Sequence, residues 1–146
     1  MHSITRKLCA FALLFTTFAG AAEAQAVDSV TGGGWIFPTA SNGRGSFGFT
    51  FANTATPTGH LTYIDHGTSM RVQSTSITSY TIVNATTRTV TGTCRVNGVP
   101  GFTFSVTVAD HGEPATLDTF GITIASIAYV ANDVLAGGNV QLHPVP

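Results

Sequence analysis

The chain has almost no lysine and few charged residues of any kind. Charged side chains make up 9% of its 146 residues, and its only lysine is Lys7. From residue 27 onward, four arginines stand against six acidic residues, which gives a net charge of −2 with neutral histidines. Proteins that bind nucleic acids or anionic membranes use clustered basic side chains to neutralise phosphates. The composition therefore argues against both kinds of partner.

Long apolar runs are also absent, except at the start of the chain. Two basic residues precede a mostly apolar run at 8–22, and small residues follow where a signal peptidase requires them. This pattern is typical of a secretory signal peptide. We predict a signal peptide over 1–26, cleaved after Ala24 or Ala26, and a single exported domain over 27–146 that is secreted, periplasmic or at the cell surface. No later run reaches the roughly 20 apolar residues of a membrane span, so no span is expected.

Cysteine is scarce as well, because the chain contains only Cys9 and Cys94. Since Cys9 lies inside the predicted signal peptide, the mature domain would keep Cys94 alone and could form no disulfide within the chain. We interpret Cys94 as a buried thiol that packs as a small hydrophobic side chain. A reactive or intermolecular thiol is the alternative.

Helix-forming residues are few after the predicted signal peptide, and β-branched residues dominate. Segments with strand character recur at short spacing: 30–37, 46–52, 60–65, 70–76, 79–83, 88–96, 102–109, 120–124, 127–130 paired with 134–135, and 139–143. We predict an all-β domain, either a single antiparallel β-sandwich or a closed β-barrel of about nine to ten strands with no substantial helix.

Alternation is clearest in three segments, each with one apolar face and one face rich in threonine and serine. Segment 46–52 places phenylalanines at every second position, 88–96 alternates Val90 with Thr91, and 102–109 repeats the pattern after a hairpin turn at Asn97-Gly98. Such strands suit an antiparallel sheet with one face exposed to water.

The loop 110–118 concentrates three carboxylates, Asp110, Glu113 and Asp118. Calcium is bound by carboxylate and carbonyl oxygens, often on loops between strands. Asp110, Glu113 and Asp118 are therefore the predicted metal ligands, with Ca²⁺ as the possible cofactor. In the alternative interpretation the loop is a polar turn, in which Asp110 and Asp118 accept backbone N–H bonds.

Other chemical signals are weak. The histidines His60, His66, His111 and His143 lack the spacing of a zinc site and are expected at the surface. A Cys94–histidine nucleophile pair is disfavoured because Cys94 lies on the apolar face of its strand. The aromatic residues Trp35, Tyr63, Tyr80 and Tyr129 could line a carbohydrate or peptide groove, although core packing is favoured for Trp35 and Tyr63.

Several segments together resemble a known family: 31–36, 45–49, 59–65, 106–114, 118–120 and 137–143. The chain is similar to the post-COAP (post choice-of-anchor protein) β-domain of bacterial secreted and cell-surface proteins, over nearly the whole mature domain. The resemblance implies a β-domain of unknown function with no catalytic residues to carry over. That domain often lies at the C-terminal end of longer extracellular proteins. Ala115 stands where a glycine is usual, which weakens the ion-binding interpretation of the loop.

The favoured function is a secreted, non-enzymatic β-domain that acts as an extracellular binding, adhesion or assembly module. Its partner would be an extracellular protein, a glycan or a small molecule. One alternative is a small β-barrel that holds a lipophilic ligand in a cavity lined by Phe47, Phe49, Phe104, Val106 and Phe120. A second alternative is an enzyme that uses the loop 110–118.

Overall fold

The computed structural model describes residues 26–146, and these form one antiparallel sheet of nine strands. The strands are β1 (Ser29–Ile36), β2 (Gly45–Ala52), β3 (Thr58–Asp65), β4 (Met70–Ile82), β5 (Thr87–Val96), β6 (Val99–Ala109), β7 (Thr119–Ile124), β8 (Tyr129–Val134) and β9 (Gly137–His143). Two single 3₁₀ turns, η1 (Ala115–Leu117) and η2 (Ala125–Ile127), flank β7. The predicted all-β, antiparallel class is confirmed. The predicted signal peptide lies outside the described residues, apart from Ala26.

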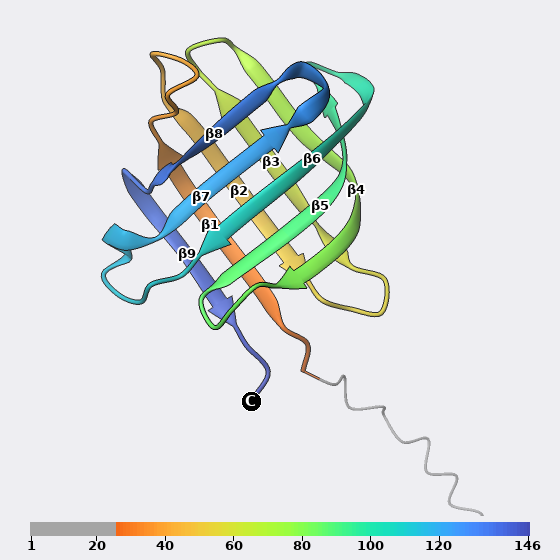
Figure 1. Ribbon diagram of the computed structural model, residues 1–146, viewed down its shortest axis with the longest axis vertical. Helices are drawn as coiled ribbons and strands as arrows, with labels where there is room; N and C mark the ends of the chain where they lie inside the picture. Colours follow the sequence, from red (N-terminus) through yellow and green to blue (C-terminus); the bar gives the residue numbers. More distant parts are fainter. Residues whose placement is uncertain (1–25) are drawn as a thin grey trace, which may run out of the picture.

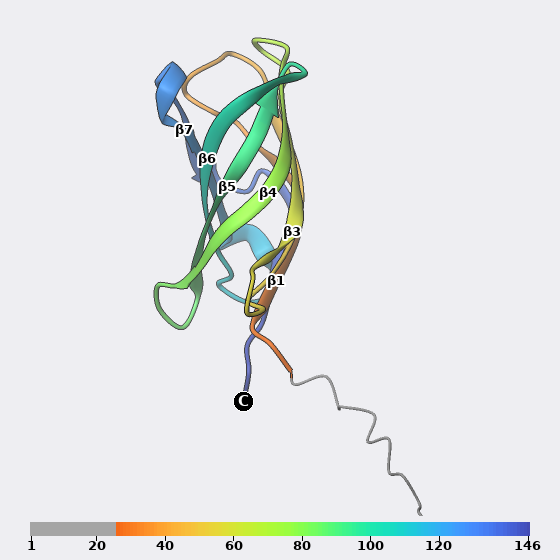
Figure 2. The same cartoon turned by 90° about the vertical axis from the view of Figure 1, so that its right-hand side faces the viewer.

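The order of strands in the sheet is β8-β7-β6-β5-β4-β3-β2-β1-β9. Consecutive strands are therefore neighbours from β1 to β8, and only β9 returns to pair with β1. The two edge strands, β8 and β9, are joined by just Leu135 and Ala136. So short a connection can link opposite edges only if the sheet curls until those edges approach each other. The curl is plain in the two views, where β6 and β7 lie on one side and β1 and β3 on the other (Figures 1 and 2).

The inner face of the curl holds the hydrophobic core, and aromatic rings fill its centre. Phe47 on β2 stacks on Phe120 on β7, with ring centroids 4.1 Å apart. Phe49 stacks on Phe51 at 5.1 Å, and Tyr63 lies 5.8 Å from Phe120. Each of these side chains has 7% or less of its surface exposed. Because β2 and β7 meet through these rings, the core joins the two sides of the curled sheet.

The tight turn predicted at Asn97-Gly98 is present between β5 and β6. Both residues have positive φ angles, 50° and 81°. The left-handed conformation is readily adopted by asparagine and glycine, which is why this pair favours a two-residue hairpin. The predicted alternation on the two strands is also confirmed, because Val90, Cys94 and Val106 are fully buried.

Two predicted strand boundaries are wrong. Segments 70–76 and 79–83 form one strand, β4, because register shifts at Ser74/Ser76 and Ile77/Ser79 let it pass through two irregularities without ending. Segments 127–130 and 134–135 are not a hairpin, since β8 runs unbroken from Tyr129 to Val134 and pairs with β7.

Trp35 is not the core residue that the sequence suggested, whereas Tyr63 is fully buried. The glycines Gly32 and Gly34 share the inward face of β1 with Val30, so Trp35 points outward and remains half-buried. The indole packs against the backbone at Gly137, and the Arg44 guanidinium lies 5.1 Å from the ring centroid. Glycine at 137 leaves room for the indole in this position, because an added Cβ would lie 2.2 Å from it.

Between residues 26 and 146, the structure contains no helix with the length and apolar character needed to cross a membrane.

Candidate functional site

The loop 110–118 lies against the edge of β9, and two of its carboxylates reach that strand. Asp118 accepts hydrogen bonds from His111 N at 2.8 Å and from Val140 N at 3.0 Å. Asp110 accepts from Gly112 N and from Leu142 N, both at 2.9 Å. The amides of Val140 and Leu142 point away from β1, toward the open edge of the sheet. The two aspartates therefore cover an edge that another strand could otherwise pair with.

The structure does not bring the third predicted metal ligand to the same place. Glu113 is exposed at the tip of the loop, whereas Asp118 is fully buried. Among residues 26–146, no three His, Cys, Asp or Glu side chains are grouped so that they could hold a metal ion. The backbone bonds made by Asp110 and Asp118 are those of the polar-turn alternative, and calcium binding here stays a prediction.

A buried carboxylate that the sequence analysis missed lies at the end of β3. Asp65 Oδ1 accepts bonds from Ser41 Oγ at 2.6 Å, Gly67 N at 2.9 Å and Thr68 N at 3.3 Å. Its other oxygen accepts from the Tyr129 hydroxyl at 2.7 Å. Burial raises the pKa of Asp65, but these hydrogen bonds to the ionised form outweigh it and leave the pKa below its usual value.

The two tyrosines of this network are held in their neutral forms. Tyr63 and Tyr129 hydroxyls lie 2.7 Å apart, and both side chains are buried. Burial raises the pKa of Tyr63 to about 12, and burial followed by the bond to Tyr63 raises the pKa of Tyr129 further. The Gly67 amide donates to Asp65 Oδ1 in an Asx-type turn, and the sequence Asp65-His66-Gly67 is a local signal for that turn. The bond to Tyr129 joins positions 64 residues apart and has no such signal.

A second missed network surrounds the ion pair of Asp28 and Arg88. The guanidinium donates from Nε and Nη2 to the two carboxylate oxygens at 2.7 and 2.8 Å, and from Nη1 to the carbonyls of Asn84 and Thr87. The Tyr80 hydroxyl donates to Asp28 as well. The hydrogen bond from Arg88 is the main cause of the lowered pKa of Asp28, and the pKa of Arg88 is raised in turn.

A signal for this ion pair was present in the sequence. Arg88 has the same parity as Val90 and Cys94 on β5, so strict alternation places it on the inner face, where it is 2% exposed. A buried arginine requires a partner, but the sequence gives no indication that Asp28 supplies it, 60 residues away.

The histidines and the cysteine occupy the predicted environments. His60, His66, His111 and His143 are all exposed, and His66 Nε2 lies 3.0 Å from Ser46 Oγ. Cys94 is buried in the core with a free thiol, and burial raises its pKa. A thiol in that state is a poor nucleophile.

The outer surface of β4 to β7 carries hydroxyl side chains in register, and we call it the hydroxyl face. One row crosses all four strands and joins Ser79, Thr91, Ser105 and Thr123 as directly paired residues. Two further cross-strand pairs, Thr89–Thr107 and Thr93–Thr103, lie on either side of this row. Neighbouring strands are about 4.8 Å apart, so the hydroxyl groups form a regular grid.

Hydrogen bonds connect many of these hydroxyls across the strands. Thr89 and Thr107 lie 2.9 Å apart, Thr78 and Thr91 lie 3.1 Å apart, and Ser79 also bonds to Thr91. Thr93 bonds to Thr75 at 2.7 Å and to Ser76 at 2.6 Å. A hydroxyl has one donor and two acceptor positions, so each pair leaves hydrogen-bonding capacity directed toward solvent.

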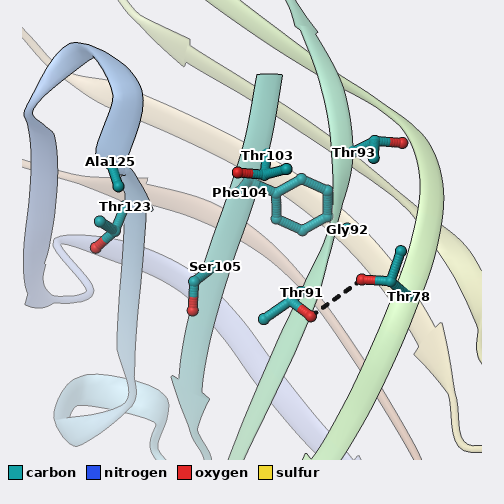
Figure 3. A pocket seen from close by; sticks show the side chains of 9 residues that line it. All are labelled: Thr78, Thr91, Gly92, Thr93, Thr103, Phe104, Ser105, Thr123 and Ala125. Atoms are coloured by element: carbon teal, nitrogen blue, oxygen red, sulfur yellow. Dashed lines mark hydrogen bonds between the residues drawn. The ribbon is translucent and has the colours of Figure 1, made fainter. Parts of the chain in front are cut away.

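Two hollows lie side by side on the hydroxyl face. The first, of about 300 Å³, is lined by Thr78, Thr91, Gly92, Thr93, Thr103, Phe104, Ser105, Thr123 and Ala125 (Figure 3). The second, of about 280 Å³, is lined by Ser105, Thr107, Thr119, Gly121, Ile122, Thr123, Val130, Ala131 and Asn132. Ser105 and Thr123 line both, so the hollows adjoin at these two residues. None of the lining residues is charged. Neither hollow includes Trp35, Tyr63, Tyr80 or Tyr129, the aromatic residues suggested for a groove.

Fold and site together define an antiparallel β-domain with a neutral, hydroxyl-lined and hollowed sheet face. No family model, no curated protein and no solved structure matches the chain.

Proposed function

We propose that this chain is an exported, non-enzymatic binding module, and that the hydroxyl face is its ligand-binding surface. The observation that carries the proposal is the pair of adjoining hollows on that face, each lined by uncharged side chains. A ligand site typically combines a concave surface with a few polar groups that fix orientation. The paired hydroxyls of β4 to β7 supply those groups.

The positions of the ionisable groups support a binding function rather than catalysis. Asp28 and Asp65 accept bonds that hold the fold together, and Asp110 and Asp118 hold the loop against β9. None of these four carboxylates lines either hollow. General acid–base catalysis needs a titratable group within hydrogen-bond reach of the reacting atom, so the hollows lack the machinery that an enzyme would use there.

The tightly packed interior favours surface binding over the lipophilic-ligand alternative. That alternative requires open space between Phe47, Phe49 and Phe120, but the rings of Phe47 and Phe120 are parallel and in contact. Phe104 and Val106 are likewise at most 2% exposed. Protein atoms occupy the centre that the ligand would need.

We also infer that the architecture of the curled sheet is that of a flattened barrel rather than a two-sheet sandwich. All nine strands belong to one continuous sheet. Leu135 N bonds to the Asp118 carbonyl and Ala136 N bonds to the Trp35 carbonyl, so the short connection between the two edge strands is held beside β7 at one end and β1 at the other. Continuous pairing gives a stiff support for the hydroxyl grid.

A direct test is retention of the purified mature protein on cell-envelope material from the producing organism. The variant Ser105→Ile places a bulky side chain where the two hollows meet and removes a shared hydroxyl. Isoleucine suits a strand position, so the fold should persist. The matched control, Thr50→Ile, lies on an exposed position of β2 outside both hollows.

We expect the wild type and Thr50→Ile to be retained and Ser105→Ile to be lost from the envelope fraction. Equal retention of all three proteins would show that the hydroxyl face is not the binding surface. Turnover of any substrate in a broad hydrolase panel, abolished by a single point change, would overturn the non-enzymatic assignment.

A further inference from the structure

The chemistry of the hydroxyl face indicates which class of ligand it would accept. We propose that the ligand is an uncharged glycan chain, bound across β4 to β8 in the two adjoining hollows. This inference rests on the proposed function and adds the chemical class of the ligand.

The absence of charge among the lining residues selects against ionic ligands. Phosphate-bearing polymers and acidic polysaccharides require basic side chains for charge pairing, and neither hollow contains an arginine. Arg95, the next outward-facing residue of β5 beyond Thr93, is outside both linings. The linings themselves therefore supply no charge pairing for an anion.

A protein partner is disfavoured by the lack of anchoring side chains. Energetically dominant positions in protein interfaces are enriched in tryptophan, tyrosine and arginine, and threonine and serine are under-represented among them. Phe104 is the one aromatic residue in the linings, and it is 2% exposed. The linings contain one exposed large apolar side chain, Val130 at 55%, and no tryptophan, tyrosine or arginine.

Threonine can complement both the apolar and the hydroxyl-bearing surfaces of a sugar ring. A pyranose presents C–H groups on its faces and hydroxyls around its rim, and threonine presents a methyl group beside a hydroxyl. The row of Ser79, Thr91, Ser105 and Thr123 would exchange hydrogen bonds with sugar hydroxyls, since each side can donate and accept.

The hollowed shape favours a single chain of sugar units over a flat crystalline surface. Two adjoining hollows of about 300 and 280 Å³ share Ser105 and Thr123, so consecutive units of one chain would occupy them in turn. A flat lattice would instead rest on the rims and leave both hollows empty. A substitution at Ser105 or Thr123 should therefore affect the binding of both sugar units.

The experiment divides the envelope material into two samples before the binding assay. One sample is digested with protease, and the other is treated with periodate, which cleaves the vicinal diols of sugars. We expect retention of the wild-type protein to survive protease and to be lost after periodate. Soluble neutral polysaccharides, namely dextran, arabinoxylan, soluble starch and hydroxyethyl cellulose, should compete in at least one case, whereas heparin should not.

Single-residue variants then locate the binding. Thr123→Val keeps the shape of threonine but removes a hydroxyl that lines both hollows, and we expect it to weaken retention roughly 3- to 10-fold. Thr50→Val, outside the hollows, should leave retention unchanged.

The outcomes separate the glycan inference from the proposed function. Retention that resists periodate and is lost on protease treatment would overturn the glycan and indicate a protein partner, while leaving the binding module in place. Competition by heparin would also overturn an uncharged ligand. No retention on untreated envelope would overturn the proposed function itself.

Discussion

At the scale of single residues, the buried acids of this domain are structural groups that the sequence could identify only in part. Asp65 has a local turn signal, and Arg88 has the parity of an inward-facing residue, but their partners Tyr129 and Asp28 are distant in sequence. The sequence analysis predicted a metal site in loop 110–118 because three carboxylates lie close together in the sequence there. In the structure, the role of each carboxylate follows from the hydrogen-bond donors that it meets after folding, and not from how close the acidic residues are in the sequence.

Asp65 gives a prediction about stability and pH. Its folded-state pKa lies below the usual aspartate value of 3.8, so its ionised form stabilises the fold above about pH 4. That contribution is lost as the pH falls from about 4 through the folded-state pKa. Asp65→Asn replaces an acceptor oxygen facing Tyr129 or the turn amides with an NH₂ group. We expect it to reduce the free energy of unfolding at pH 7 by about 1–3 kcal/mol.

Urea denaturation of the wild type and Asp65→Asn at pH 7 and at pH 3 measures this effect. The difference in stability between the two proteins should shrink at pH 3, because below about pH 4 the unfolded wild-type chain takes up a proton at Asp65 and the advantage of the ionised folded form falls. Glu113→Gln, at an exposed position, serves as the control and should follow the wild type. A difference that stays constant over the whole pH range would contradict the role assigned to the ionised carboxylate.

At the scale of elements, alternation located the strands wherever one face is apolar and the other polar. It succeeded for β2, β5 and β6, whose inner side chains are mostly apolar, Arg88 on β5 being the charged exception, and whose outer ones are mainly small or hydroxyl-bearing. It divided β4 because the irregularities near Ser74 and Ile77 break the two-residue period, although pairing with β5 continues. It divided β8 because Asn132-Asp133 resembles a turn, but Asn132 pairs with Gly121.

The hydroxyl face illustrates the same limit for the candidate site. The sequence predicts that threonines and serines lie on the solvent-exposed face of the sheet. It does not show which of them become neighbours. Register decides that Ser105 pairs with both Thr91 and Thr123, and curvature decides where the face is hollow. Both depend on contacts between strands across the whole sheet.

The loop 110–118, whose aspartates bond to the edge of β9, gives a prediction at the scale of elements. Asp118→Ala removes the acceptor for His111 N and Val140 N, and leaves the latter amide buried without a partner. We expect the loss to cost about 2–4 kcal/mol in the free energy of unfolding and to speed hydrogen exchange at Val140. Leu117→Ala, at a position 66% exposed in the same loop, should change neither quantity appreciably.

The same variant tests the predicted calcium site. A carboxylate oxygen has about two lone pairs, so the bonds to backbone amides do not by themselves prevent coordination of an ion. If Asp110, Glu113 and Asp118 bind calcium, excess calcium chloride raises the Tm of the wild type and fails to raise that of Asp118→Ala. No shift in the wild type, or an equal shift in both proteins, would dismiss the site.

At the scale of the whole molecule, the curl of a single sheet brings strands distant in sequence face to face, and aromatic packing fixes that arrangement. Phe120 on β7 contacts rings of both β2 and β3, with Phe47 at 4.1 Å and Tyr63 at 5.8 Å between centroids. The stiffness of the hydroxyl face should depend on this contact, because Ser105 and Thr123 lie on strands whose inner side chains pack into the same core.

Phe120→Ala should therefore affect the whole domain. Deleting a buried phenylalanine leaves a cavity and typically costs about 3–5 kcal/mol, which should appear as a large loss of stability in denaturant unfolding. Because the wild-type interior is filled by stacked rings, we expect no saturable uptake of a fluorescent fatty acid by the wild-type protein. Saturable uptake by the wild type that changes in Phe120→Ala and does not change in Thr50→Val would instead establish the lipophilic-ligand function. It would also contradict the idea that a filled core supports the outer face.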